Sequence, residues 1–143
     1  MKIRKGTEAD FEAVLEIIKE LALFERKPDA VINNVERMHE EKKYFEFFVA
    51  EVEGEIVGMA LYFFAYYTWV GKSLYLDDLY VKPDYRGRNI GKALLVEVLA
   101  VAKDENCKRM RWQVLDWNTA AIEFYKKMNA SLNQEWINCD MHF

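Results

Sequence analysis

The chain has 143 residues, of which 52% are hydrophobic and 31% charged, and its net charge is −4. A chain of this size can bury most of the surface that its unfolded form exposes, so we expect a single domain over residues 1–143. The acidic balance argues against nucleic-acid binding. Because no apolar run reaches the ~18 residues that span a bilayer and the start lacks a signal-peptide core, we expect no membrane contact and a cytoplasmic location.

The first half of the chain predicts a strand, two helices and a hairpin. Residues 2–5 alternate as in a short strand. Thr7 and Asp10 form a helix-capping pattern, and the helix that follows has one apolar face. Its members are Phe11, Val14, Leu15, Ile18, Leu21 and Ala22. Pro28 ends this helical region, and we expect a second, weaker helix over about 30–43. We also expect two strands, over 46–53 and 56–64, which form a hairpin around the turn 53–55.

The second half alternates strands and helices. A second hairpin turns near 69–72 and returns through a strand over 74–81, which Pro83 ends because it has no N–H to donate. A helix over about 90–104 and a strand over 110–115 follow. Next comes a helix that Asn118 caps and Asn129 closes, and the chain ends in a strand-like segment over 136–143. The order βααβββαβαβ predicts an α/β (α+β) fold, with a mixed sheet covered by helices on both faces.

A basic, glycine-bearing turn joins the strand 74–81 to the helix 90–104. It contains two arginines and two glycines, in the order Arg86, Gly87, Arg88, Asn89, Ile90 and Gly91. A strand that leads through such a turn into a helix is typical of phosphate binding, because free N–H groups and the helix dipole both favour an anion there. The spacing fits neither GxGxxG nor a P-loop. Taken alone, the segment could also be an ordinary turn.

This turn resembles the acyl-CoA loop of the GNAT N-acetyltransferases, (Q/R)-x-x-G-x-(G/A). Together with the segment 117–125, it resembles the diamine acetyltransferases, which act on spermidine/spermine or thialysine. The resemblance covers nearly the whole chain and implies a GNAT fold with a mostly antiparallel twisted sheet, acetyl-CoA as co-substrate and a homodimer. It also implies a set of cofactor-binding residues: Leu79, Tyr80, Val81, Arg86, Gly87, Arg88, Asn89, Ile90, Gly91, Lys92, Asn118, Ala121 and Tyr125. Asn89 stands where many members have Gly.

Two residues are candidates for the proton transfers. Tyr125 matches the family tyrosine near the CoA sulfur, and a phenol can protonate a leaving thiolate; by composition alone it could be a core residue. Asp77 stands where the diamine acetyltransferases usually have Glu, and it could hold the substrate ammonium or pass its proton through water. Asp78 follows it, and since neighbours on a strand point to opposite faces, we expect at most one of them in a given pocket. A salt bridge at the strand end is the alternative.

The substrate-side candidates are Phe24, Glu25, Trp69, Asp77, Asp78 and Asp116. By resemblance, Phe24, Glu25 and Trp69 line the amine pocket, where Trp69 offers a cation–π face; Glu25 could equally be a solvated charge. Cys107 and Cys139 form no metal-ligand spacing, and we expect no metal. The hypothesis is that the protein transfers an acetyl group from acetyl-CoA to a small primary amine, such as a polyamine or a lysine analogue like thialysine. We expect direct transfer in a ternary complex, because no cysteine or serine lies in the sequence context of a catalytic nucleophile. An acetyltransferase for protein lysines or N-termini and a non-catalytic acyl-CoA-binding module remain open.

Overall fold

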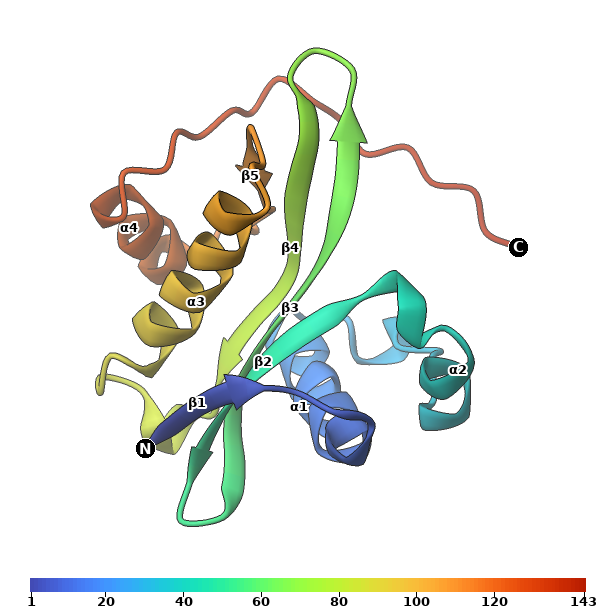
Figure 1. Cartoon of the computed structure of the whole chain (residues 1–143), viewed down its shortest axis with the longest axis vertical. Coiled ribbons are helices and arrows are strands. Elements are labelled where there is room, and N and C mark those ends of the chain that lie inside the picture. Colours follow the sequence, from blue (N-terminus) through green and yellow to red (C-terminus); the bar gives the residue numbers. More distant parts are fainter. The chain divides into compact units, whose positions relative to one another are not determined.

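The computed structural model describes all residues, 1–143, which form two compact units, residues 1–113 and 114–143. The first unit contains one five-stranded sheet in the order β1-β2-β3-β4-β5 (Figure 1). Its strands are β1 (Lys2–Lys5), β2 (Glu46–Val52), β3 (Glu55–Tyr67), β4 (Gly71–Val81) and β5 (Met110–Arg111). All neighbours pair antiparallel except β4 and β5, which are parallel. The predicted mixed α+β fold is confirmed.

Three helices cover the sheet of the first unit, α1 (Phe11–Phe24), α2 (Val35–Glu40) and α3 (Ile90–Asp104). Helices α1 and α2 lie on one face and α3 on the other, as predicted (Figure 1). The capping pattern before α1 is present, since the Thr7 N–H donates to the Asp10 carboxylate over 2.8 Å. The weaker helix expected over about 30–43 is shorter, because Asn34 caps it and starts it at Val35. Single turns at Pro28–Ala30 and Lys42–Tyr44 flank it.

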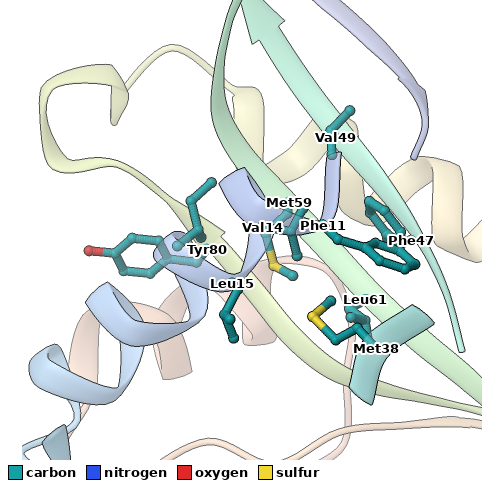
Figure 2. Packing of buried hydrophobic residues seen from close by; sticks show 10 residues of the cluster. Phe11, Val14, Leu15, Met38, Phe47, Val49, Met59, Leu61 and Tyr80 are labelled. Carbon is teal, nitrogen blue, oxygen red and sulfur yellow. The ribbon is translucent and has the colours of Figure 1, made fainter. Parts of the chain in front are cut away.

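The main core lies between α1, α2 and the sheet (Figure 2). Alternate residues of β2 and β3 point toward α1 because strand side chains alternate between faces. The buried members of this core are Phe11, Val14, Leu15, Ile17, Met38, Phe47, Val49, Met59, Leu61 and Tyr80. On the other face, Gly58 allows α3 to pack closely, since a Cβ there would lie 3.3 Å from Leu94. The sheet is therefore buried on both sides, and each fully buried apolar side chain stabilises the fold by about 1.5–3 kcal/mol.

One predicted strand is shorter than expected and another is absent. The strand expected over 110–115 is limited to Met110–Arg111, and the segment 136–143 contains no strand. The alternating pattern of 136–143 is real, but an alternating pattern becomes a strand only where a neighbouring backbone completes the ladder, and none pairs with it. In the second unit, α4 (Thr119–Lys127) begins as predicted, with the Asn118 side chain accepting from the Ala121 N–H. Asn129 closes it with a φ of 65°. None of the helices combines the length and apolar character needed to cross a membrane.

Candidate active site

A β-bulge in β4 places two carboxylates on one face of the sheet. Leu61 of β3 pairs with Asp78, but the next residue, Tyr62, pairs with Leu76, so Asp77 is an extra residue without a partner. Asp78 shares the face of Leu61, which is the face that α1 and α2 cover. Asp77 lines the same cavities as Asp78. The expectation that at most one of the two reaches a given pocket is therefore wrong, because the bulge breaks the alternation on which it depended.

The two aspartates stand where two cavities meet, and we call these cavities together the acidic groove. The first lobe, of about 380 Å³, lies against α2 and the strands and is lined by Ile18, Asn33, Met38, Glu41, Tyr44, Phe45, Leu61, Phe63, Asp77 and Asp78. The second lobe, of about 410 Å³, lies against the end of α1 and is lined by Ile18, Leu21, Ala22, Glu25, Ala30, Val31, Ile32, Asn33, Asp77 and Asp78. Each lobe contains one further acid, and no lysine or arginine lines either one.

Three carboxyl groups of the groove, those of Asp77, Asp78 and Glu25, have pKa values above their usual range. Burial raises the pKa of Asp78 to about 7, and the charges of Asp77 and Glu25 add to this rise. Burial also raises the pKa of Asp77. The pKa of Glu25 is raised by burial and by Asp77, against the opposing effect of Lys27. A carboxyl group whose pKa is near neutrality can accept a proton from an ammonium group at physiological pH, so the groove can both attract a cation and deprotonate it.

The strand that carries the bulge has one open edge. Strand β5 pairs with β4 only at Leu74 and Tyr75, so the later part of β4, residues 76–81, has β3 as its single partner in the sheet. An edge strand presents unpaired N–H and C=O groups that can pair with another extended chain. Leu79, Tyr80 and Val81, which the resemblance predicts to bind the cofactor, lie on this open stretch, directly after the aspartates.

The loop after β4 is a cluster of free N–H donors. Helix α3 makes its first internal bond from Ala93 to Asn89, and no N–H group from residue 87 to residue 92 donates within the protein. Gly87 and Asn89 have left-handed φ angles of 77° and 62°, a geometry that turns successive N–H groups toward a common point. Asn tolerates this conformation better than most residues. Together with the N-terminus of the 15-residue helix α3, the loop has the backbone geometry that suits an anion.

The arginines of the loop have different surroundings. The Arg86 side chain donates from Nε to the Val81 carbonyl over 2.9 Å, and its guanidinium lies 5.1 Å from the Tyr80 ring and 5.5 Å from the Phe24 ring. Arg86 therefore ties the loop to the end of β4 and to α1. Arg88 lies over the Tyr85 ring and donates from Nη2 to the Asp84 carbonyl over 3.3 Å. Neither Arg88 nor Lys92 forms an ion pair, and Lys92 is exposed, so neither positive charge is neutralised by a carboxylate.

The remaining predicted residues lie elsewhere. Phe24 contacts Arg86 and lines neither lobe, whereas Glu25 lines the second lobe. Trp69 is 83% exposed at the tip of the β3–β4 hairpin, outside both lobes. Asn118, Ala121 and Tyr125 belong to α4 and its cap in the second unit, where the Tyr125 ring packs against Phe124 with centroids 5.4 Å apart. Asp116 is exposed in the same unit. Their functional roles stay predictions.

Comparison with known proteins identifies the family. The profile of the acetyltransferase (GNAT) family matches residues 11–130. The chain belongs to the GNAT family. Thialysine N-epsilon-acetyltransferase of Sus scrofa is 40% identical over 140 residues, which cover 90% of this chain and 82% of that protein. Spermidine/spermine N(1)-acetyltransferase-like protein 1 of Homo sapiens is 33% identical over 140 residues, covering 90% of this chain and 20% of the human protein.

Solved structures support the same fold for this GNAT protein. An aminoglycoside acetyltransferase from an uncultured soil metagenomic sample, solved with trehalose, superimposes with a TM-score of 0.82, covering 99% of this chain and 95% of that chain at 19% identity. At this identity the likeness concerns the fold alone. The family membership establishes that the protein is an acetyltransferase.

Sequence reasoning missed most of the first lobe of this acetyltransferase. Asn33, Glu41 and Tyr44 lie in the irregular segment between α1 and β2, where no periodic pattern relates them to the aspartates of β4. Phe63 was predicted only as an apolar strand residue, and Phe45 lies just before the strand predicted over 46–53. A usable signal was the excess of acids in residues 1–60, which carry a net charge of −5 against +1 for residues 61–143. That asymmetry is compatible with a cationic substrate but does not locate its site.

Proposed function

We propose that the protein transfers an acetyl group from acetyl-CoA to a small primary amine that carries at least one further positive charge. The observation that supports this most directly is the acidic groove, whose two lobes contain four carboxylates and no lysine or arginine. Each lobe has the size of a small-molecule site, which favours a small amine over a folded protein substrate. Polyamines and lysine analogues such as thialysine are the acceptor classes that the names of the relatives suggest.

The loop 87–92 is the proposed site for the pyrophosphate of acetyl-CoA. Its free N–H groups, the start of α3 and the charges of Arg88 and Lys92 fit an anion with several oxygens. Gly87 leaves open space above the backbone, since a Cβ there would meet nothing within 4 Å. The open edge of β4 at Leu79, Tyr80 and Val81 is the proposed partner of the pantetheine amides. Acetyl-CoA would supply the activated acyl group as a thioester.

The proposed reaction is a direct attack. Asp77 or Asp78 accepts one proton from the substrate ammonium, which frees the nitrogen lone pair. The nitrogen attacks the thioester carbonyl carbon, a C–N bond forms, and the C–S bond breaks. A backbone N–H at the open edge of β4 would stabilise the developing oxyanion. The departing thiolate takes a proton from a nearby acid, for which Tyr125 is the candidate by resemblance. The products are an N-acetylated amine and CoA.

The test follows release of the CoA thiol from acetyl-CoA with a panel of acceptors: 1,4-diaminobutane, spermidine, spermine, lysine, thialysine and a histone-tail peptide. We expect turnover on one or more small amines and much weaker turnover on the peptide. Tyr125→Phe is run beside the wild type and is expected to lower kcat at least tenfold if the phenol donates the final proton.

Three results would change the proposal. Turnover on the peptide alone would move the function to a protein acetyltransferase. CoA binding without turnover on any acceptor would favour the non-catalytic module. Full activity of Tyr125→Phe would keep the reaction but reject Tyr125 as its acid.

A further inference from the structure

Arg86, directly before the loop 87–92, contacts the neighbours of acids on two sides of the second lobe. Its guanidinium lies 5.1 Å from the Tyr80 ring on β4 and 5.5 Å from the Phe24 ring at the end of α1. Tyr80 shares a strand face with Asp78, and Phe24 directly precedes Glu25. Arg86 itself lines neither lobe. It therefore connects the loop to the two elements that position the acids of the second lobe.

The end of α1 closes in an unfavourable conformation. The Lys27 N–H donates to the Ala22 carbonyl over 2.8 Å, and the Arg26 N–H donates to the Leu23 carbonyl over 3.0 Å. These two bonds form a Schellman motif, whose left-handed residue is usually glycine. Here that residue is Arg26, with a φ of 64°, and a side chain in this conformation is destabilising. The last turn of α1 is therefore weaker than the rest of the helix.

The charges of the groove also act against this turn. Glu25 lines the second lobe together with Asp77 and Asp78, and no lysine or arginine lines it. Burial, then the charge of Asp77 and then that of Glu25 raise the pKa of Asp78, so the acid at the end of α1 and the acids of β4 repel one another. The contact of Arg86 with the Phe24 ring opposes this repulsion, because it attaches the end of α1 to an arginine that is bonded to the end of β4.

We propose that Arg86 is a positioning residue that couples the cofactor site to the amine site. Acetyl-CoA bound at the loop 87–92 orders the loop and with it Arg86, whose guanidinium then holds Phe24 and the last turn of α1 in place. The acids of the second lobe keep the arrangement of the structure, and the amine binds more tightly. This inference rests on the proposed function and adds a mutual dependence of the two substrates. By linkage, the amine strengthens cofactor binding by the same factor.

Amide hydrogen exchange, followed by NMR, tests the coupling without an amine. In the wild type, adding CoA is expected to slow the exchange of residues 25–27, whose N–H groups close α1. In Phe24→Leu, the loop is intact and binds CoA, but the exchange of residues 25–27 should be the same with and without CoA. Arg86→Gln should lose the same protection at a CoA concentration that saturates it.

Phe64→Leu is the matched control. Phe64 is 40% exposed and Phe24 41%, and each ring has a cation over it, since the Lys72 ammonium lies 5.1 Å from the Phe64 centroid. Phe64 lies outside both lobes. This variant removes an equivalent contact elsewhere in the sheet, so CoA should protect residues 25–27 as it does in the wild type.

Calorimetric titration of spermidine measures the coupling at the amine site. The titration is done with and without saturating CoA, which carries no acetyl group to transfer. CoA is expected to lower the Kd of spermidine about tenfold in the wild type and in Phe64→Leu. In Phe24→Leu this factor should fall to about one. Arg86→Lys keeps the positive charge but lacks the Nε–H donor and the planar guanidinium, so it should retain only part of the factor.

Three results would overturn the inference. Equal protection of residues 25–27 by CoA in the wild type and Phe24→Leu would show that the loop and α1 are not coupled through Arg86. A wild type whose affinity for spermidine does not increase with CoA would show that the sites are independent. A Kd that rises in Phe24→Leu by the same factor with and without CoA would make Phe24 a direct amine contact.

Failure of the proposed function is recognised separately, because neither measurement requires turnover. A wild type that shows the protection and the tighter spermidine binding, but releases no thiol with any amine, supports the coupling and rejects the proposed reaction. Thiol release without either effect of CoA supports the reaction and rejects the coupling. A wild type that does not bind CoA rejects both.

Discussion

The acidic groove and the loop 87–92 recognise opposite charges by different means. The groove uses side chains, since four carboxylates face two cavities that contain no basic residue. The loop uses mainly backbone, with free N–H groups and the left-handed geometry of Gly87 and Asn89. Strand β4 connects the two regions, because its bulge carries the aspartates and its end leads into the loop. We therefore expect amine binding in the groove to weaken when a charged side chain is removed, and anion binding at the loop to weaken when its backbone is distorted.

The largest effect is expected from Asp78→Asn. The substitution removes a carboxyl that, in our proposal, helps to deprotonate the acceptor, so kcat/KM for the amine should fall about 100-fold or more. The thermal midpoint should not fall, because an unpaired carboxylate in a desolvated site costs stability. Asp104→Asn, at the exposed end of α3, is the control and should change neither quantity. Wild-type turnover in Asp78→Asn, with Asp77→Asn inactive, would assign proton removal to Asp77 alone.

Gly87→Ala tests the backbone side of the comparison. Its φ of 77° disfavours a Cβ although no atom obstructs one, so the cost is conformational and amounts to about 1 kcal/mol of stability. The same strain reorients the N–H groups, and we expect the KM for acetyl-CoA to rise about tenfold. Gly54→Ala is a closely matched control, with a φ of 79° and open space around its Cβ. Equal rises of KM in both variants would show that the loop has no special role.

The pH dependence of stability reports on the groove. The pKa of Asp78 is about 7 in the folded protein against about 3.8 unfolded, so the folded state binds its proton more tightly. The free energy of unfolding should therefore fall as the pH rises through this window, by about 1 kcal/mol after allowance for solvent at the half-buried carboxyl. Urea titrations at several pH values should show a smaller fall for Asp78→Asn. Arg4 lowers the pKa of Asp10, so Asp10 changes the stability with pH in the opposite direction. This contribution is the same in both proteins and cancels when their curves are compared. Parallel curves for the two proteins would place the titration elsewhere.

Local sequence patterns were sufficient to predict most of the fold. The apolar face of α1, the hairpin strands and the helix after the basic loop follow from periodicities of 3.6 and 2, and Asn89 takes the left-handed conformation that its side chain tolerates. The segment 136–143 has the same kind of pattern but no pairing partner, so the pattern alone overpredicted a strand. Periodicity is a property of one chain segment, whereas a strand forms only when two segments pair.

The same limit explains what was missed in the site. A bulge is a mismatch between β3 and β4, so nothing in Asp77 or Asp78 alone indicates that both line one cavity. Glu41 and Tyr44 join these aspartates only through the irregular segment before β2, which no period describes. Glu25, in contrast, was predicted from the resemblance, which places it in the amine pocket; it directly follows α1.

The smallest effect is expected from Lys92→Gln, which removes an exposed charge but leaves the loop backbone intact. Because solvent and salt screen exposed charges, the KM for acetyl-CoA should rise only a few-fold at low ionic strength. The difference from the wild type should shrink as salt is added, whereas the defect of Gly87→Ala should persist. Lys103→Gln, on the same helix but at its other end, is the control. A salt-independent loss in Lys92→Gln as large as that of Gly87→Ala would show that the loop, like the groove, depends on a side-chain charge.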